Sequence, residues 1–167
     1  DTGEKLILAK ERLSVIKEDY EILGEIKGSE LEKIKYEQLL PYVKPDDGYE
    51  AFYVTLGDFV STADGSGIVH IAPAFGEDDY QISRKYNLPV MQPVNKSGKF
   101  TDEVTDFKGR FVKEADDDII LKLKEEKKLY KKEKFVHSYP HCWRCHSPLL
   151  YYARESWYIN TPSYKDK

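Results

Sequence analysis

The sequence predicts an α+β fold with a barrel-like, mostly antiparallel β core and a few flanking helices. Short runs of β-branched and aromatic residues recur along the chain, and glycine, proline or aspartate turns separate them. Only two segments, 76–86 and 116–130, have the length and apolar spacing of α-helices. The 167 residues are 40% hydrophobic and 13% aromatic, which is enough to form a core in one main domain.

The predicted strands are many and short, which favours a barrel-like sheet as the core, and the sequence contains no internal repeat. They are residues 5–9, 20–27, 36–43, 49–61, 68–73, 89–94, 135–139, 149–152 and 157–159. Short helical turns are predicted at 11–19 and at 30–34, the second of them capped by Ser29. Glycine-bearing turns are predicted at 64–67 and 95–99.

Both predicted helices carry acidic residues near their first turn, where the helix dipole stabilises negative charge. The first opens at Gly76, has acids at 77–79, and runs to about Tyr86 with Asn87 near its end. The second, 116–130, begins with three aspartates and has its apolar side chains on one side.

Net charge and cysteine content exclude several classes of protein. A net charge of −4 gives no general attraction to nucleic acid, so any RNA contact requires a local basic patch. No apolar run is long enough to cross a membrane, and the N-terminal residues do not form a signal peptide. Two cysteines do not make a disulfide framework, and they suit a reducing, cytoplasmic location.

Seven lysines lie between residues 122 and 134, interrupted by three glutamates. The commoner interpretation of such a run is a solvated helix face. The alternative is a patch that contacts tRNA phosphates, which would position RNA without recognising its sequence.

A glycine turn, a strand, a loop and a helix start follow one another between residues 64 and 80. On the predicted strand His70 shares a face with Ile68 and Ala72, and a histidine with apolar neighbours is more often a core residue than a functional one. The small residues of the loop leave room for a ligand to approach the backbone. The residue types alone therefore indicate a polar pocket near His70 and one of the helix-start acids.

Cys142 and Cys145 have the spacing of a metal knuckle, although zinc needs four ligands. His137, His141 and His146 are close in sequence and could complete a site. A redox role is the weaker interpretation, because no helix start follows the pair.

The segment GSGIVHIAPAFGEDDY at 65–80 resembles the signature of the editing domain of isoleucyl-tRNA synthetases, with Ser66 where threonine is usual. The resemblance continues through YNLPVMQPVN, TDEVTDFKGR and YPHCWRCHSPLLYYARESWYI, and so covers nearly the whole chain. It implies hydrolysis of the ester in mischarged valyl-tRNA(Ile), the second sieve that removes valine after the synthetic site has accepted it.

The resemblance also implies residue roles. Asp79 matches the essential carboxylate that holds the α-ammonium of the misattached amino acid, and His70 matches a histidine that lines the amino-acid pocket. Ala74 and Phe75 are weaker candidates for the pocket wall, and core packing explains Phe75 equally well. Glu77 and Asp78 are interpreted as ordinary helix-start acids.

The resemblance further implies an editing domain at 1–135 whose N-terminal, threonine-rich part is missing, followed at 136–167 by the CxxC knuckle and strands that return to the synthetic domain. The expected partners are the tRNA(Ile) acceptor end carrying valine and the rest of the synthetase chain. Editing needs no cofactor. ATP is expected only at the parent's synthetic domain, and zinc only in the full-length parent, where a second CxxC would join Cys142 and Cys145.

Two other hypotheses remain open at this level. The chain could be a catalytically incomplete folded fragment that binds tRNA weakly or serves structurally. It could also be a free-standing zinc protein, which predicts stoichiometric zinc in the purified chain.

Overall fold

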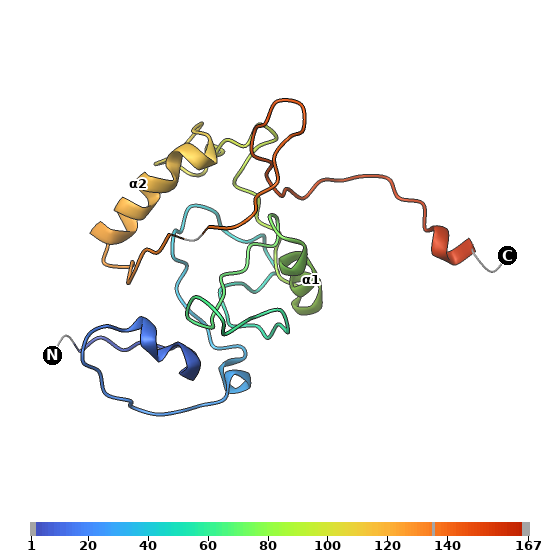
Figure 1. Cartoon of the computed structure of the whole chain (residues 1–167). Coiled ribbons are helices and arrows are strands. Elements are labelled where there is room, and N and C mark those ends of the chain that lie inside the picture. The colour runs from blue at the N-terminus through green and yellow to red at the C-terminus, as the bar shows by residue number, and fades with distance from the viewer. Residues whose placement is uncertain (1–2, 135, 165–167) are drawn as a thin grey trace.

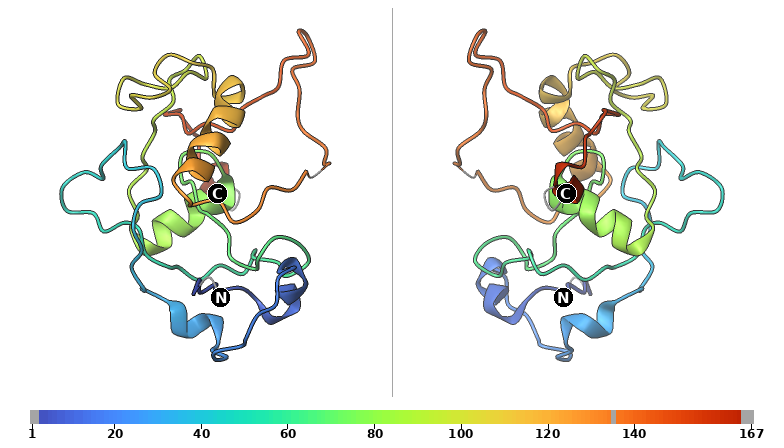
Figure 2. Two further views of the ribbon diagram at one scale, coloured as in Figure 1. Left: turned by 90° about the vertical axis from the view of Figure 1, so that its left-hand side faces the viewer. Right: turned by 90° about the vertical axis from the view of Figure 1, so that its right-hand side faces the viewer.

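The computed structural model describes residues 3–134 and 136–164. It contains the α-helices α1 (Glu77–Tyr86) and α2 (Val112–Glu125), shown in Figure 1. It also has three short 3-10 helices, η1 (Lys10–Val15), η2 (Gly28–Leu31) and η3 (Thr161–Tyr164). Both views in Figure 2 show the N-terminal segment with η1 and η2 at one end of the molecule and α2 toward the other.

The predicted barrel-like α+β fold is wrong, because no described residue belongs to a β-strand. In the part of the chain that the structure describes, extended segments meet at four isolated antiparallel bridges. The predicted strand 20–27 is exposed at every residue, and Leu23 is 69% exposed. β-branched and aromatic residues form a strand only where a hydrogen-bonded neighbour and a buried face are available, and the segment 20–27 has neither a bridge partner nor a buried residue. Phe135, the first residue of the predicted strand 135–139, lies outside the described residues.

The contact between residues 33–36 and 52–54 comes nearest to a sheet. Lys35 and Tyr53 form an antiparallel bridge between the two segments. Lys33 and Phe52, which lie on either side of this bridge, have φ angles of 66° and 58°. Positive φ is incompatible with an extended strand, so the pairing does not propagate.

The structure confirms the first predicted helix, whereas the bounds of the second differ from the prediction. Gly76 is the extended N-cap residue of α1, and Asn87 ends the helix in the left-handed conformation at φ 53° and ψ 45°. Helix α2 begins and ends about one turn earlier than predicted. Lys127, at φ 56°, stops it, and the N–H of Lys128 donates to the carbonyl of Leu123 at 2.8 Å.

Local turn chemistry was predicted with mixed success. The helical turns exist as η1 and η2, but Ser29 does not cap the second one. Lys27 occupies the N-cap position of η2, and its N–H donates to the Glu30 carboxylate at 2.8 Å. The turn at 95–99 is confirmed, because the Asn95 side-chain oxygen accepts the N–H groups of Ser97 at 2.9 Å and Lys99 at 3.1 Å.

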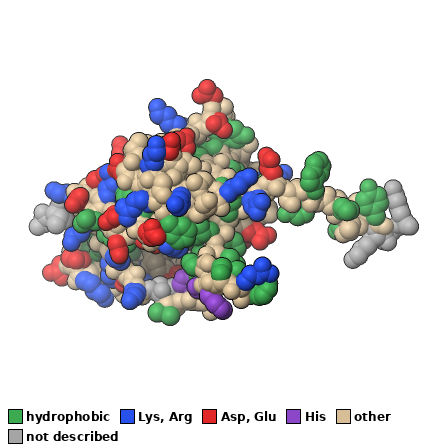
Figure 3. All heavy atoms as spheres, turned by 90° about the horizontal axis from the view of Figure 1, so that it is seen from above, with side chains coloured by type: hydrophobic (Ala, Val, Ile, Leu, Met, Phe, Trp, Pro, Cys, Tyr) green, Lys and Arg blue, Asp and Glu red, His purple; other side chains and the backbone are tan. Residues whose placement is uncertain are grey.

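The C-terminal segment extends away from the body of the molecule (Figure 1). Trp157 is 101% exposed, and its neighbours Tyr158 and Ile159 are also largely exposed. Figure 3 shows apolar side chains along this projecting segment, and acidic and basic side chains intermingled over the visible face of the body. Within the described ranges, no helix is both long enough and apolar enough to span a membrane.

The main core is small and lies where α2 packs on the loop that precedes it. Val104, Phe107 and Ala115 are buried together. Partly buried hydrophobic side chains pack against them, namely Tyr42, Phe100 and Ile119. The Tyr42 and Phe107 rings meet edge to face, with 6.3 Å between centroids. This core fixes α2 and the 100–111 loop to the segment around Tyr42.

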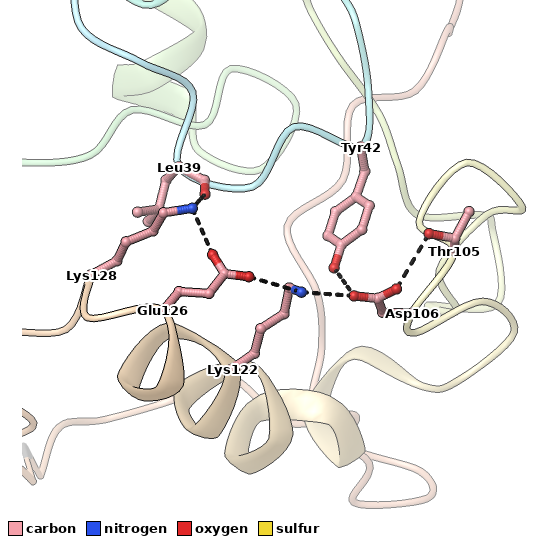
Figure 4. Close-up of polar contacts among 7 residues, drawn as sticks. All are labelled: Leu39, Tyr42, Thr105, Asp106, Lys122, Glu126 and Lys128. Carbon is pink, nitrogen blue, oxygen red and sulfur yellow. Dashed lines mark hydrogen bonds and ion pairs between the residues drawn. The ribbon is translucent and has the colours of Figure 1, made fainter.

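A polar network reinforces the same junction (Figure 4). The Tyr42 hydroxyl donates to Asp106 at 2.6 Å. Lys122 of α2 lies between Asp106, at 3.0 Å, and Glu126, at 2.9 Å. Lys128 adds a further ion pair, with its ammonium group 2.6 Å from the Glu126 carboxylate. We call Tyr42, Asp106, Lys122, Glu126 and Lys128 the α2 network.

Candidate functional site

Helix η1 holds the glycine turn, residues 64–67, from one side. The Arg12 guanidinium donates from Nε to the carbonyl of Gly65 at 2.9 Å and from Nη1 to that of Ala63 at 3.0 Å. The backbone N–H of Ala9, just before η1, donates to the carbonyl of Ser66 at 2.7 Å. Three carbonyls of one short segment thus accept from a single element that is distant in sequence.

The turn has no space for larger side chains on the face that meets Ala9. Gly67 has a φ of 77°, and a Cβ placed on it would lie 2.4 Å from the Ala9 Cβ. Glycine is therefore required at this position for both conformation and space. The Ser66 hydroxyl accepts the Ile68 N–H at 3.3 Å and donates to the Ile68 carbonyl at 3.2 Å, which shapes the exit from the turn.

His70 follows this turn and is exposed. Its interpretation as a buried core histidine is therefore wrong. Ile68 and Val69 are also about half exposed, so residues 68–70 form an open edge of the molecule. An imidazole in this position is accessible to a ligand.

Asp79 lies in the first turn of α1 and is half-buried, whereas Glu77 and Asp78 are exposed. The Asp79 carboxylate turns back over the preceding loop, and its Oδ2 accepts the N–H of Ala72 at 3.2 Å. This bond fixes the orientation of the carboxylate at the N-terminal, positive end of the α1 dipole. Among the described residues, no cation pairs with Asp79.

The loop between His70 and Asp79 is anchored by the C-terminal part of the chain. Ala74 is only 2% exposed, and its carbonyl accepts the Ala153 N–H at 2.9 Å. Phe75 is partly buried and packs edge to face on Tyr152, with 6.3 Å between ring centroids. Core packing therefore accounts for both side chains, and their role as a pocket wall stays a prediction.

The site residues are thus only partly brought together. Asp79 contacts the backbone two residues beyond His70, while no hydrogen bond or ion pair joins the two side chains themselves. The contributions of Arg12 and Tyr152 were missed in the sequence. A lone arginine in a helical turn and one tyrosine among thirteen carry no signal that could have indicated them.

The CxxC segment forms a tight loop with both thiols free. The N–H of Cys142 donates to the backbone carbonyl of Ser147 at 2.8 Å, and the N–H of His146 donates to that of Cys142 at 2.8 Å. The Cys145 sulfur lies 2.9 Å from the Ser147 hydroxyl, and this hydrogen bond is the main cause that lowers the pKa of the Cys145 thiol.

The nearby histidines do not complete a zinc site. The Nδ1 atoms of His137 and His141 face the backbone carbonyls of Ser138 and Tyr139. Residues 3–134 and 136–164 contain no group of three or more potential metal ligands. Because a structural zinc site requires four ligands, the described residues by themselves do not fit one.

The lysine run is largely neutralised by neighbouring acids. Four of its lysines have carboxylate partners within ion-pair distance, namely Lys122, Lys128, Lys131 and Lys132. Paired ammonium groups offer less positive potential to a phosphate. The geometry therefore favours the interpretation as a solvated face over the phosphate patch.

Comparison with known proteins decides the family. No family model matches the chain. An isoleucine–tRNA ligase of Clostridium acetobutylicum is 54% identical over 167 residues, which is all of this chain and 16% of the ligase. Those of Clostridium novyi and Thermoplasma volcanium are 51% and 49% identical over 99% and 98% of this chain. These residues belong to the isoleucyl-tRNA synthetase family. The chain spans about one sixth of the length of these synthetases.

Membership in the isoleucyl-tRNA synthetase family extends over the entire segment described above, from η1 to the exposed tail. The glycine turn, the open edge at His70 and the half-buried Asp79 are therefore features of a synthetase segment.

Proposed function

We propose that this chain is the editing part of an isoleucyl-tRNA synthetase and hydrolyses the ester of mischarged valyl-tRNA(Ile). The observation that carries the proposal is the setting of Asp79. One of its oxygens is fixed by the Ala72 N–H, and no cation among the described residues neutralises it. A half-buried carboxylate in this state is ready for a cationic ligand.

The α-ammonium of an aminoacyl ester is such a ligand. A charge-assisted hydrogen bond between it and Asp79 contributes about 1.5–3 kcal/mol. This bond orients the ester for attack by water, so Asp79 acts mainly by positioning the substrate. His70, exposed at the adjacent edge, contacts the amino-acid side chain and contributes to size selection. Neither residue is proposed as a general base.

The remaining parts of the proposal concern the longer protein. The acceptor end of tRNA(Ile) is the partner, and a threonine-rich segment outside this chain supplies the opposite wall of the pocket. Activation of isoleucine with ATP takes place elsewhere in the synthetase, in the cytoplasm. Cys142 and Cys145 provide half of a zinc site whose other two ligands come from a second CxxC outside this chain.

The proposal is tested in the full-length synthetase that carries this chain, by charging tRNA(Ile) with valine. The wild-type enzyme is expected to accumulate no valyl-tRNA(Ile), because editing removes it. The Asp79→Ala variant is expected to accumulate it while charging isoleucine at the normal rate. If Asp79→Ala accumulates no more valyl-tRNA(Ile) than the wild type, this assignment is wrong.

A further inference from the structure

The glycine turn is held by contacts that the proposed function does not use. Arg12 donates to the carbonyl of Gly65 in the turn at 2.9 Å and to that of Ala63, directly before the turn, at 3.0 Å, and the Ala9 N–H donates to that of Ser66 at 2.7 Å. We call these three hydrogen bonds the η1 clamp. No residue of η1 is buried, so the clamp is not part of a hydrophobic core.

Arginine is suited to this task. Its planar guanidinium presents several N–H donors in a fixed fork, so that two carbonyls can be held at a set separation. The carbonyls of Ala63 and Gly65 lie two residues apart in a tight turn and accept from two different nitrogens of Arg12. A lysine presents its donors from a single nitrogen on a flexible stem, so it would hold the two carbonyls less rigidly.

The clamp acts on the path of the chain toward His70. Residues 68–70 leave the turn directly and are exposed, so no core packing fixes their course. Among the described residues they also lack a strand partner. Two constraints therefore bound this edge. Asp79 holds the Ala72 N–H on the far side, and on the near side the turn is fixed where Gly67 meets Ala9 and Arg12 holds the carbonyls.

We propose that Arg12 is a positioning residue for amino-acid selection in the editing site. By holding the glycine turn, it sets the place of His70 relative to Asp79 and so the size of the amino-acid pocket. This inference rests on the proposed editing function and adds to it a residue from a distant part of the sequence.

The test uses the full-length synthetase with Arg12→Met, which keeps the aliphatic stem and removes the donors. We expect kcat for valyl-tRNA(Ile) hydrolysis to fall by roughly 10-fold with little change in KM, since small misplacements near a reacting group are costly. The preference for valyl over isoleucyl esters should fall as well, because the pocket wall is loosened. Arg12→Lys should restore part of both quantities.

Lys10→Met is the matched control. Lys10 lies on the same helix η1 and is exposed, and its ammonium pairs with Glu25 at 3.0 Å rather than with the turn. This variant should edit like the wild type. All variants should charge isoleucine normally, which reports that the synthetase is folded. If Arg12→Met has the same kcat and the same preference as Lys10→Met, the proposal is overturned.

A second pair of variants tests the clamp through its steric contact. Gly67→Ala should reproduce the loss seen with Arg12→Met, because the new Cβ lies 2.4 Å from that of Ala9. Adding Ala9→Gly removes the clashing atom and should recover part of the activity and preference. An absence of coupling between the two substitutions would contradict the clamp.

Failure of the proposed function is distinguishable from failure of the clamp. A wild-type enzyme that does not hydrolyse valyl-tRNA(Ile), or an Asp79→Ala variant that retains activity, refutes the editing function itself. In that case the η1 clamp is tested by hydrogen exchange, because the Ala9 N–H donates to the Ser66 carbonyl and is thereby protected from exchange. Faster exchange of Ala9 in Arg12→Met supports the clamp, and unchanged exchange refutes it.

Discussion

Single residues at tight turns set much of the geometry of this chain, and Gly98 illustrates how. It has a φ of 73°, and a Cβ placed on it would lie 2.7 Å from the Phe111 ring and 2.9 Å from the Leu150 side chain. Gly98 thereby lets the 95–99 turn close against two other parts of the chain. Its tolerance of substitution is a test of the structure at the scale of one residue.

Gly98→Ala is expected to lower the free energy of unfolding of the 167-residue chain by about 1–3 kcal/mol, through backbone strain and overpacking. Urea denaturation followed by circular dichroism measures the change. Gly24→Ala is the control, because no atom lies within 4 Å of the new Cβ. Equal stability of the two variants would show that the 95–99 turn is not packed as described.

At the scale of single residues, caps and turns could be predicted from the sequence, whereas exposure and distant contacts could not. Gly76, Asn87 and Asn95 were recognisable because capping and turn chemistry is local. Exposure of His70 was not predictable, because the alternation of apolar residues around it suggested a buried strand face. The role of Arg12 was not predictable either, because its acceptors lie more than fifty residues away in the sequence.

At the scale of elements, the attachment of α2 depends on titratable groups. Hydrogen bonds from Tyr42 and Lys122 lower the pKa of the Asp106 carboxyl, with Tyr42 the larger cause. Hydrogen bonds from Lys128 and Lys122 lower the pKa of Glu126. Burial, followed by the hydrogen bond to Asp106, raises the pKa of Tyr42 to about 12. Attachment of α2 should therefore weaken at both extremes of pH.

The acid side follows from the two carboxylates. Their pKa values are lowered in the folded state, so their contribution is present above the ordinary values of 3.8 and 4.5 and is lost as pH falls below them. Asp106→Asn should remove part of this dependence, which denaturation midpoints between neutral and acid pH measure. An unchanged slope of stability against pH in Asp106→Asn would contradict the network in Figure 4.

The alkaline side follows from Tyr42. Its pKa is raised, so its contribution is present below the ordinary value of 10.0 and is lost as pH rises toward about 12. Tyr42→Phe should flatten the fall in denaturation midpoint over this window. Tyr49→Phe is the control, because Tyr49 is 44% exposed and its hydroxyl makes no hydrogen bond to a described residue. The network would be refuted if both variants lost stability as steeply as the wild type.

Elements were predictable where their stability is local. Helix α1 has a recognisable start and stop within its own sequence, and its bounds agree with the prediction. Strands depend on partners elsewhere in the chain, and here positive φ angles at Lys33 and Phe52 prevent one pairing from extending. The end of α2 was missed because its last apolar residues suggested continuation, whereas Lys127 adopts a left-handed conformation.

At the scale of the whole molecule, the C-terminal tail around residues 157–159 is the most exposed apolar part of the described residues. Trp157 is fully exposed and Trp143, in the CxxC loop, is largely exposed. These are the two tryptophans of the sequence, so they determine its indole fluorescence. We expect both to be quenched by acrylamide without a protected fraction in the 167-residue chain. A protected fraction would show that the tail or the loop packs against the body.

We propose that Asp79 anchors the ammonium group of a misattached amino acid in an isoleucyl-tRNA synthetase. The most direct measurement is single-turnover hydrolysis of valyl-tRNA(Ile) by the full-length enzyme with Asp79→Asn, compared with Asp78→Asn at the exposed neighbouring position. We predict that Asp79→Asn slows hydrolysis by about 100-fold through loss of substrate positioning, and that Asp78→Asn edits like the wild type. Equal rates of hydrolysis by the two variants would show that Asp79 does not position the substrate.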